Sequence, residues 1–207
     1  MALVNCGIRK DRDVTPDDCQ LMRRVQAGEF RCFDVLVERY RPALVRVAVG
    51  MLSDQALAED VVQETFLAVF AARHTFNPAF HFRTWLWTIL LNFCRRYRSR
   101  RGRQPQQLVR SALANGDGPE LADLQTPETA LTAVLRREQS EQLQRLLNDL
   151  PDVQADAIRL RFFAELTYHE IAQSMGVSLG GAKLRVRAGL AKLSQQLCGD
   201  EESCHEL

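Results

Sequence analysis

The chain has 207 residues, 46% of them hydrophobic and 26% charged, and its 27 lysines and arginines nearly balance 26 aspartates and glutamates. This composition is typical of a globular protein and excludes a collagenous, wholly disordered or disulfide-scaffold chain. The length allows one ordinary domain or two small ones, at ~100–200 residues per domain. No stretch approaches ~18 uncharged apolar residues, so we expect no membrane insertion. The start of the sequence lacks the apolar core of a signal peptide, which favours a cytoplasmic protein.

The first half carries apolar residues at the spacing of helices. Phe30, Phe33, Val37 and Tyr40 recur at this spacing, which predicts a helix with one buried face. Pro42 in the same stretch is compatible with a helix start or a kink. Neither half shows the β-branched alternation of strands, so we predict an all-α fold.

The next predicted helix, over residues 53–72, is acidic. Ser53 or Asp54 is a plausible N-cap, and the apolar stripe comprises Leu57, Val61, Val62, Phe66 and Val69. The polar positions carry Glu59, Asp60, Gln63 and Glu64. Composition alone favours a solvated surface for these residues. Asp60 and Glu64 share a face at i, i+4, but no histidine joins them, so we expect no metal site.

An aromatic and basic stretch follows a loop that Asn77-Pro78 marks near residues 73–83. Six arginines without an acid occupy residues 95–103, where they could neutralise phosphates or form a plain solvated face. Trp85 and Trp87 lie two residues apart on one predicted helix, so we expect one ring in the core and the other nearer the surface. Tyr97, between two arginines, is a better candidate for stacking on a base than for core packing.

Prolines, glycines and polar residues then divide the chain in two. The segment from 101 to 128 is rich in helix breakers and poor in aromatics, which is typical of a linker. We therefore predict two small helical domains, 18–103 and 138–197, joined by a flexible linker over 104–137. The tail over 198–207 has no assigned role.

The second domain contains a helix-turn-helix pattern. A short helix from Tyr168 to Met175 is predicted to end at Gly176, and Ser178 can cap the next helix. That helix carries Lys183, Arg185, Arg187 and Lys192 without an acid. In a helix-turn-helix the second helix enters the DNA major groove. An ordinary helical hairpin with a solvated basic face is the alternative.

The sequence contains little that would indicate a catalytic site or a cofactor-binding site. No nucleophile or carboxylate stands at a suggestive spacing from the four histidines, and no phosphate-binding glycine motif is present, so we predict no enzyme activity, no metal and no cofactor. The six cysteines contain no CxxC pair, which favours reduced thiols. Cys32 and Cys94 are expected to pack as small hydrophobes. A metal- or redox-responsive tail using Cys198, Cys204 and His205 is a further hypothesis.

The order of these motifs resembles bacterial sigma factors of the extracytoplasmic-function (ECF) group. It runs from AEDVVQETFLAVF through FRTWLWTILLN and a polar linker to LPDVQADAIRLRFFAELTYHEIAQSMGVS. The resemblance covers about 18–103 and 139–197. It implies a factor that binds the RNA polymerase core at the β′ clamp helices and directs it to promoter DNA, both duplex and melted. It also implies an anti-sigma partner.

The resemblance further implies three groups of functional residues. Polymerase contacts would come from Asp54, Glu59, Asp60, Gln63, Glu64 and Phe66. The −10 element would be captured and held by Phe76, Asn77, Phe82, Arg83, Trp85, Trp87, Asn92, Arg95, Arg96 and Tyr97. The −35 element would be read by Ser178, Lys183, Leu184, Arg185 and Arg187.

The recognition helix departs from the family pattern. Family members usually read like GTVKSRLHRAR, whereas this chain reads GGAKLRVRAGL. Gly181 and Gly189 would each cost a helix interior ~1 kcal/mol relative to alanine, which suggests a weaker or unusual −35 contact. The rival hypothesis of a helix-turn-helix regulator that never contacts polymerase leaves the acidic helix and the arginine run without a role.

Overall fold

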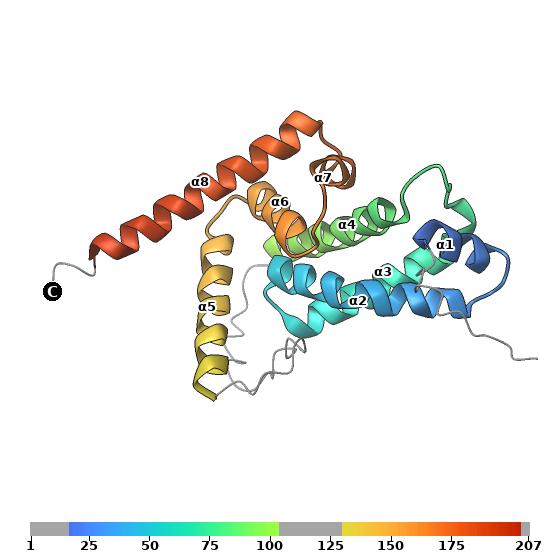
Figure 1. Cartoon of the computed structure of the whole chain (residues 1–207), viewed down its shortest axis with the longest axis horizontal. Helices are drawn as coiled ribbons and strands as arrows, with labels where there is room; N and C mark the ends of the chain where they lie inside the picture. Colours follow the sequence, from blue (N-terminus) through green and yellow to red (C-terminus); the bar gives the residue numbers. More distant parts are fainter. Residues whose placement is uncertain (1–16, 104–129, 204–207) are drawn as a thin grey trace, which may run out of the picture.

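The computed structural model describes residues 17–103 and 130–203, and within these ranges it contains helices and no strands (Figure 1). The first half consists of α1 (Asp18–Gln26), α2 (Arg31–Leu52), α3 (Gln55–Ala71), the short 3-10 turn η1 (Arg73–Thr75) and α4 (Phe82–Arg103). The second half consists of α5 (Ala130–Asn148), α6 (Asp152–Phe162), α7 (Tyr168–Met175) and α8 (Leu179–Ser203). The predicted all-α fold is confirmed. Helix α5 begins inside the segment that we predicted as linker.

The first half is a bundle in which α2, α3 and α4 pack their apolar faces together. Leu36 and Leu44 of α2 meet Val62 of α3 and Leu90 of α4 in one buried cluster. The turn between α2 and α3 is tight because Ser53 adopts a left-handed conformation with φ of 53°. Asp54 then caps α3 by accepting a hydrogen bond from the Leu57 backbone amide at 3.1 Å. Of the two predicted caps, Asp54 is therefore the one used.

The second half contains the predicted helix-turn-helix. At the start of α7, Thr167 and Glu170 form a capping box, in which each side chain accepts a hydrogen bond from the other's backbone amide. Gly176 ends α7 in the left-handed region with φ of 66°. Ser178 caps α8 by accepting a hydrogen bond from the Gly181 amide at 3.0 Å. These observations confirm the short first helix, the glycine turn and the capped second helix.

Gly189 has a packing role that the sequence did not reveal. A Cβ atom added there would lie 2.5 Å from Cδ1 of Ile158 in α6. The glycine therefore permits the backbone of α8 to approach α6 closely. The helix cost that we expected for Gly189 is therefore only part of its role, because the close contact with α6 also requires a glycine at this position.

The two halves pack against each other along α4. Figure 1 shows α7 lying beside α4, and α6 packs against α2. Leu166, Ile171 and Met175 of the second half join the same buried cluster as Leu86 and Trp87 of α4. The predicted pair of domains thus shares one continuous apolar core. We call this arrangement the closed packing.

The described residues carry no membrane-spanning or metal-binding feature. None of their helices combines the length and apolar character that crossing a bilayer requires. The described side chains also contain no group of three or more potential metal ligands. The hypothesis of a sensing tail involves Cys198, Cys204 and His205, whose side chains lie outside the described part of the chain.

Candidate nucleic-acid interface

The polar side of α3 is open to solvent. Glu59, Asp60 and Gln63 are exposed on it, and Leu67 beside them is 69% exposed although it is a large apolar residue. We call these four residues the acidic face. Leu67 was not among the residues predicted from the sequence, although its position just after the buried Phe66 places it off the apolar stripe. A single exposed apolar side chain is common on protein surfaces, so Leu67 adds apolar area to this face without by itself identifying a binding site.

Two of the residues predicted to contact polymerase instead stabilise the helical bundle. Phe66 is buried and lies 6.2 Å, centroid to centroid, from the ring of Phe33 in α2. Asp54 is half-buried as the cap of α3. The structure therefore places both beneath or beside the acidic face, where they hold α3 in position.

Glu64 is turned from α3 toward the basic end of α4. Its Oε1 atom accepts a hydrogen bond from the Tyr97 hydroxyl at 2.7 Å, and its Oε2 atom lies 3.2 Å from a guanidinium nitrogen of Arg96. The hydrogen bond to Glu64 raises the pKa of the Tyr97 hydroxyl, because deprotonation would leave two facing anions. Glu64 thus joins the predicted polymerase-binding helix to two predicted DNA-binding residues.

The loop before α4 forms a hollow lined by aromatic rings. A cavity of about 410 Å³ is lined by Phe76, Phe80, Trp85 and, from α7 in the second half, Gln173. Phe76 and Trp85 stand 5.3 Å apart between ring centroids. Rings around a hollow of this size can stack on an unpaired base. We call this cavity the aromatic cavity.

Other residues predicted for the −10 contact divide into core and surface groups. Phe76, Phe82 and Trp87 are buried, whereas Trp85 is half-buried. This difference confirms that one tryptophan ring is structural and the other lies nearer the surface. Asn77 is exposed in the loop, where its side chain accepts a hydrogen bond from the Ala79 amide at 2.9 Å.

The polar side chains at the basic end of α4 differ in their exposure to solvent. Asn92 and Arg96 are exposed, and Arg95 is half-buried. The Arg96 guanidinium carbon lies 4.7 Å from the centroid of the Phe93 ring, a cation–π distance. These side chains could contact DNA phosphates with α4 in its present conformation.

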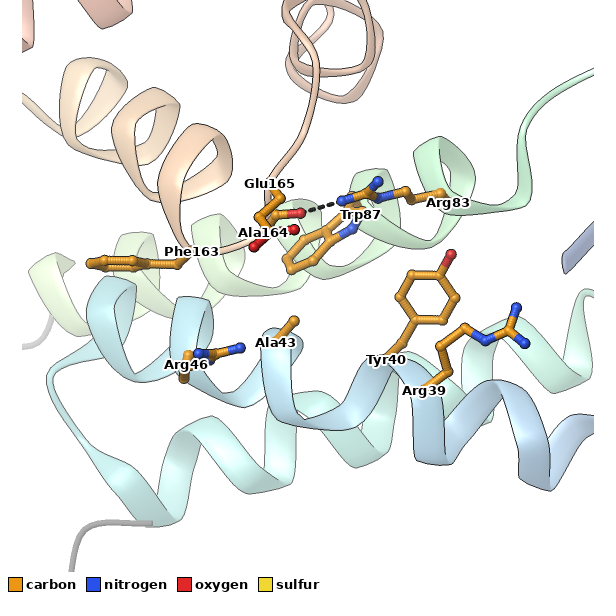
Figure 2. A pocket seen from close by; sticks show the side chains of 9 residues that line it. All are labelled: Arg39, Tyr40, Ala43, Arg46, Arg83, Trp87, Phe163, Ala164 and Glu165. Carbon is orange, nitrogen blue, oxygen red and sulfur yellow. Dashed lines mark hydrogen bonds between the residues drawn. The ribbon is translucent and has the colours of Figure 1, made fainter. Parts of the chain in front are cut away.

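Arg98 and Arg83, by contrast, are engaged by the second half. Arg98 donates two hydrogen bonds to the carboxylate of Asp156 in α6, at 3.1 and 2.7 Å, and also lies 3.3 Å from Asp152. Figure 2 shows Arg83 reaching to the loop after α6, where it donates a hydrogen bond to the carbonyl oxygen of Ala164. Arg98 belongs to the six-arginine run, but sequence spacing did not identify its partner in α6.

A second cavity of about 190 Å³ lies at this junction (Figure 2). It is bounded by Arg39 and Arg46 of α2, Arg83 and Trp87 of α4, and the loop at Glu165. Residues of both halves therefore line it.

The helix α8 carries the residues predicted for duplex DNA. Lys183 and Arg187 are exposed, Arg185 is half-buried, and Leu184 is 68% exposed. Ser178 is exposed at the helix start, although its hydroxyl caps α8. The exposed set mixes positive charge with one large apolar side chain.

The cysteines of the described part of the chain form no disulfide. Cys19, Cys32 and Cys94 are free, and the last two are buried as predicted. Burial raises the pKa of the Cys94 thiol to about 12, so this thiol stays protonated at neutral pH.

Comparison with known families finds two matches along the chain. Residues 36–104 match the model of sigma-70 region 2, and residues 140–193 match that of sigma-70 region 4. The RNA polymerase sigma-H factor of Pseudomonas aeruginosa is 33% identical over 173 residues, covering 82% of this chain and 88% of that protein. The ECF RNA polymerase sigma-E factor of Haemophilus influenzae is 31% identical, covering 82% of this chain and 89% of that protein.

Solved structures show the same architecture. The structure of CnrH in complex with the cytosolic domain of CnrY matches with a TM-score of 0.67 and 27% identity, over 88% of this chain and 98% of that one. The sigma factor RpoE in complex with the anti-sigma factor NepR, from Bartonella quintana, matches with a TM-score of 0.60 and 26% identity. That match covers 80% of this chain and 96% of the solved chain.

Proposed function

This chain belongs to the ECF group of RNA polymerase sigma factors, and from this premise we propose how its surfaces divide the work of transcription initiation. As a sigma factor it binds the RNA polymerase core and directs it to selected promoters. The chain is an initiation factor, so the polymerase performs the chemistry and we propose no enzyme activity for the factor itself. We also propose that it acts in the cytoplasm.

The acidic face of α3 is the proposed contact with the β′ clamp helices. Glu59 and Asp60 supply exposed carboxylates, and Leu67, about two turns further along α3, supplies exposed apolar area. An interface core of this kind gains from apolar burial while the flanking charges fix its register. Glu64 is a weaker candidate because both of its oxygens already have partners on α4.

The aromatic cavity and the basic end of α4 form the proposed −10 site. A base that leaves the duplex loses a few kcal/mol of stacking and pairing. Trp85 and the rings beside it could recover part of this by stacking, and Arg95 and Arg96 could hold the neighbouring phosphates. The buried Phe76 lines this cavity, and the buried Phe82 packs against both Phe76 and Trp85.

The helix α8 is the proposed reader of the −35 element. Lys183 and Arg187 can reach phosphates or base edges in the major groove. Leu184 can contact a thymine methyl group there, which would give the site an apolar component.

The observation that carries this function is the joint presence of region 2 and region 4 in one chain, with the acidic face exposed. A helix-turn-helix regulator without polymerase binding would need only the second half. An anti-sigma factor is a further proposed partner, since RpoE of Bartonella quintana is found with the anti-sigma factor NepR.

The test is association with core polymerase followed by run-off transcription on genomic DNA. Wild-type protein should bind core and produce discrete starts, whereas Asp60→Arg should weaken core binding by roughly two orders of magnitude, since a charge is reversed within the contact. Glu138→Arg, a reversal of an exposed acid on α5, is the matched control and should bind normally. Failure of the wild-type protein to bind core would refute the proposal.

A further inference from the structure

Helix α1 is the part of the first half in which no contact with polymerase or DNA was predicted. The match to sigma-70 region 2 begins at residue 36, which lies after this helix. The apolar side of α1 is fully buried in the bundle through Leu21, Met22 and Val25. At the start of α1, the Asp18 carboxylate accepts a hydrogen bond from the Tyr40 hydroxyl of α2. Helix α1 is therefore fixed to the bundle from its first turn to its last.

Gln26, the last residue of α1, holds the backbone that leads into the aromatic cavity. Figure 1 shows α1 beside the segment that joins α3 to α4. The side-chain nitrogen of Gln26 donates hydrogen bonds to the carbonyl oxygens of Arg73, at 2.7 Å, and of Phe76, at 3.0 Å. Arg73 is the first residue of η1, and Phe76 directly follows η1. A side-chain amide nitrogen carries two hydrogens, so this one group can hold both ends of the turn.

The bonds from α1 act on residues that shape the aromatic cavity. Phe76 lines the cavity, and its buried ring stands 5.3 Å from the ring of Trp85 between centroids. At the other end of the loop, the Cys19 thiol of α1 lies 3.7 Å from the carbonyl oxygen of Phe80, which also lines the cavity. Helix α1 therefore contacts the backbone of two residues whose rings line the cavity.

The side chain of Arg73 fixes the start of η1 independently of Gln26. Its guanidinium carbon lies 4.6 Å from the centroid of the Phe70 ring at the end of α3, a cation–π distance. It also donates a hydrogen bond to the Phe70 carbonyl at 2.9 Å. Within the described residues, by contrast, the Phe76 carbonyl accepts its hydrogen bond from Gln26 alone. Loss of the Gln26 donor should therefore free the end of the turn and leave its start in place.

We propose that Gln26 is a positioning residue for the −10 site, because its side chain fixes the loop in the shape that receives an unpaired base. A site whose rings are already in place loses less conformational freedom when a base stacks in it, so binding is tighter. Gln26 acts through the backbone of Phe76 and not by contact with DNA. The inference rests on the proposed function of the aromatic cavity, and it extends that function to α1.

Three variants separate the donors of Gln26 from its size and from charge. Gln26→Glu keeps the size of the side chain but places carboxylate oxygens opposite two carbonyl oxygens, so the loop should be repelled. Gln26→Met removes the donors without adding a charge. Gln20→Glu makes the same chemical change at an exposed position of the same helix and is the matched control.

The first experiment measures binding of the full chain, without polymerase, to a fluorescent mixed-sequence single strand of ~16 nucleotides. Gln26→Glu should weaken binding roughly tenfold and Gln26→Met roughly threefold, because a displaced Phe76 disturbs the surface on which a base stacks. Gln20→Glu should bind with an affinity close to that of wild type. All three variants should bind core polymerase normally, since the acidic face of α3 is unchanged.

A strand without bases separates positioning from a general loss of structure or a general effect of charge. When abasic sites replace the central bases, the strand keeps its phosphates but offers no base for stacking. Wild type and Gln26→Glu should bind this strand equally, and on the intact strand their affinities should depend equally on salt, which reports phosphate contacts. An equal loss for Gln26→Glu on intact and abasic strands would overturn the inference.

Tryptophan fluorescence supplies a readout that needs neither DNA nor polymerase. The chain has two tryptophans, so Trp87→Phe leaves Trp85 as the only one. In that background Gln26→Glu should increase the quenching of Trp85 emission by acrylamide, because a displaced Phe76 uncovers the indole, whereas Gln20→Glu should not. A loss of strand affinity without a change in quenching would mean that the loop has not moved. An unchanged strand affinity would mean that the position of the loop does not matter, and either result overturns the inference.

Trp85→Ala distinguishes failure of the inference from failure of the proposed function. If Trp85→Ala weakens strand binding while both Gln26 variants bind like wild type, the cavity binds the strand and Gln26 does not position it. If Trp85→Ala itself binds like wild type, the cavity is not the strand-binding site. The proposed −10 function then fails, and the role of Gln26 fails with it.

Discussion

Two adjacent helices of the first half, α3 and α4, differ in what covers their polar sides. On α3 the polar side faces solvent, and Glu59, Asp60 and Gln63 are exposed. On α4 part of the polar side faces the second half, which holds Arg83 and Arg98. Both helices have the sequence of an amphipathic segment, so the difference arises from a partner segment located far along the chain.

The comparison teaches that charge pattern alone does not tell whether a basic surface is available. The run at the end of α4 contains Arg96, which is exposed, and Arg98, which is half-buried against Asp156. The placement of α6 accounts for the difference in exposure between these two arginines. The predictions below test whether α3 is the open helix and α4 the covered one.

The largest effect is expected at Trp87 of α4. Trp87→Ala should lower the free energy of unfolding by about 3–5 kcal/mol, because it empties a fully buried site in the cluster that joins the halves. Trp85→Ala should cost much less stability, since that ring is half-buried, yet it should weaken the binding of a DNA single strand. Chemical denaturation measures the first effect and fluorescence anisotropy the second.

Trp87→Phe is the control for this pair. The indole nitrogen of Trp87 is buried without a hydrogen-bond partner, so replacing the indole by a phenyl ring removes an unsatisfied donor along with some packing. We expect a loss of stability well below that of the alanine variant. Equal losses for Trp85→Ala and Trp87→Ala would contradict the division into surface and core rings.

A smaller effect is expected at the start of α3. Asp54→Ala should lower the free energy of unfolding by ~1 kcal/mol, because the Leu57 amide loses its cap. Asp54→Ser keeps a capping oxygen and should recover most of the loss. The affinity of the Asp54→Ser variant for core polymerase should stay close to that of wild type. This result would show that Asp54 caps α3 and does not contact polymerase. A large loss of core affinity in Asp54→Ser would assign Asp54 to the interface.

Local structure was predictable where a few neighbouring residues decide it. The helix-turn-helix was predicted from Gly176 and Ser178, because a left-handed cap and a side-chain cap depend on adjacent residues only. The separation of Trp85 from Trp87 followed from helical periodicity. The apolar stripe of α3 was predicted on the same grounds.

The contacts of the second half with α4 and within the second half were not predictable, because they join residues far apart in the sequence. Nothing near Arg98 indicates that Asp156 will hold it, and nothing near Gly189 indicates that Ile158 will pack there. The two halves were also expected to be separate domains, since a breaker-rich linker does not reveal whether its flanking domains share a core. Leu67 was missed for a different reason, since a single apolar residue off a stripe is common on protein surfaces.

Chemical labelling of cysteines tests how well α4 is covered. Burial raises the pKa of the Cys94 thiol to about 12, so at pH 8 this group is both shielded and protonated. Iodoacetamide should therefore label half-buried Cys19 far faster than Cys94 in the native protein, as followed by mass spectrometry of the peptides. Equal native rates at the two cysteines would contradict the packing of α4.

The smallest expected effect concerns Glu64, the residue of α3 that contacts α4 directly. Its hydrogen bond to the Tyr97 hydroxyl raises the pKa of that hydroxyl. Glu64→Gln removes the negative charge, so the pKa of Tyr97 should fall toward its ordinary value. An ultraviolet titration of phenolate in a Tyr168→Phe background resolves Tyr97, because burial raises the pKa of Tyr40 even further.

Asp60→Asn is the matched variant for this titration, since it removes an exposed carboxylate from the same helix. It should leave the titration of Tyr97 unchanged while weakening core binding, whereas Glu64→Gln should shift the titration. If both variants shift Tyr97 equally, the effect arises from the net charge of α3, and the direct bond from Glu64 to Tyr97 is not its cause. A shift confined to Glu64→Gln would show that α3 serves two partners, with its outer carboxylates free for polymerase and Glu64 fixed on α4.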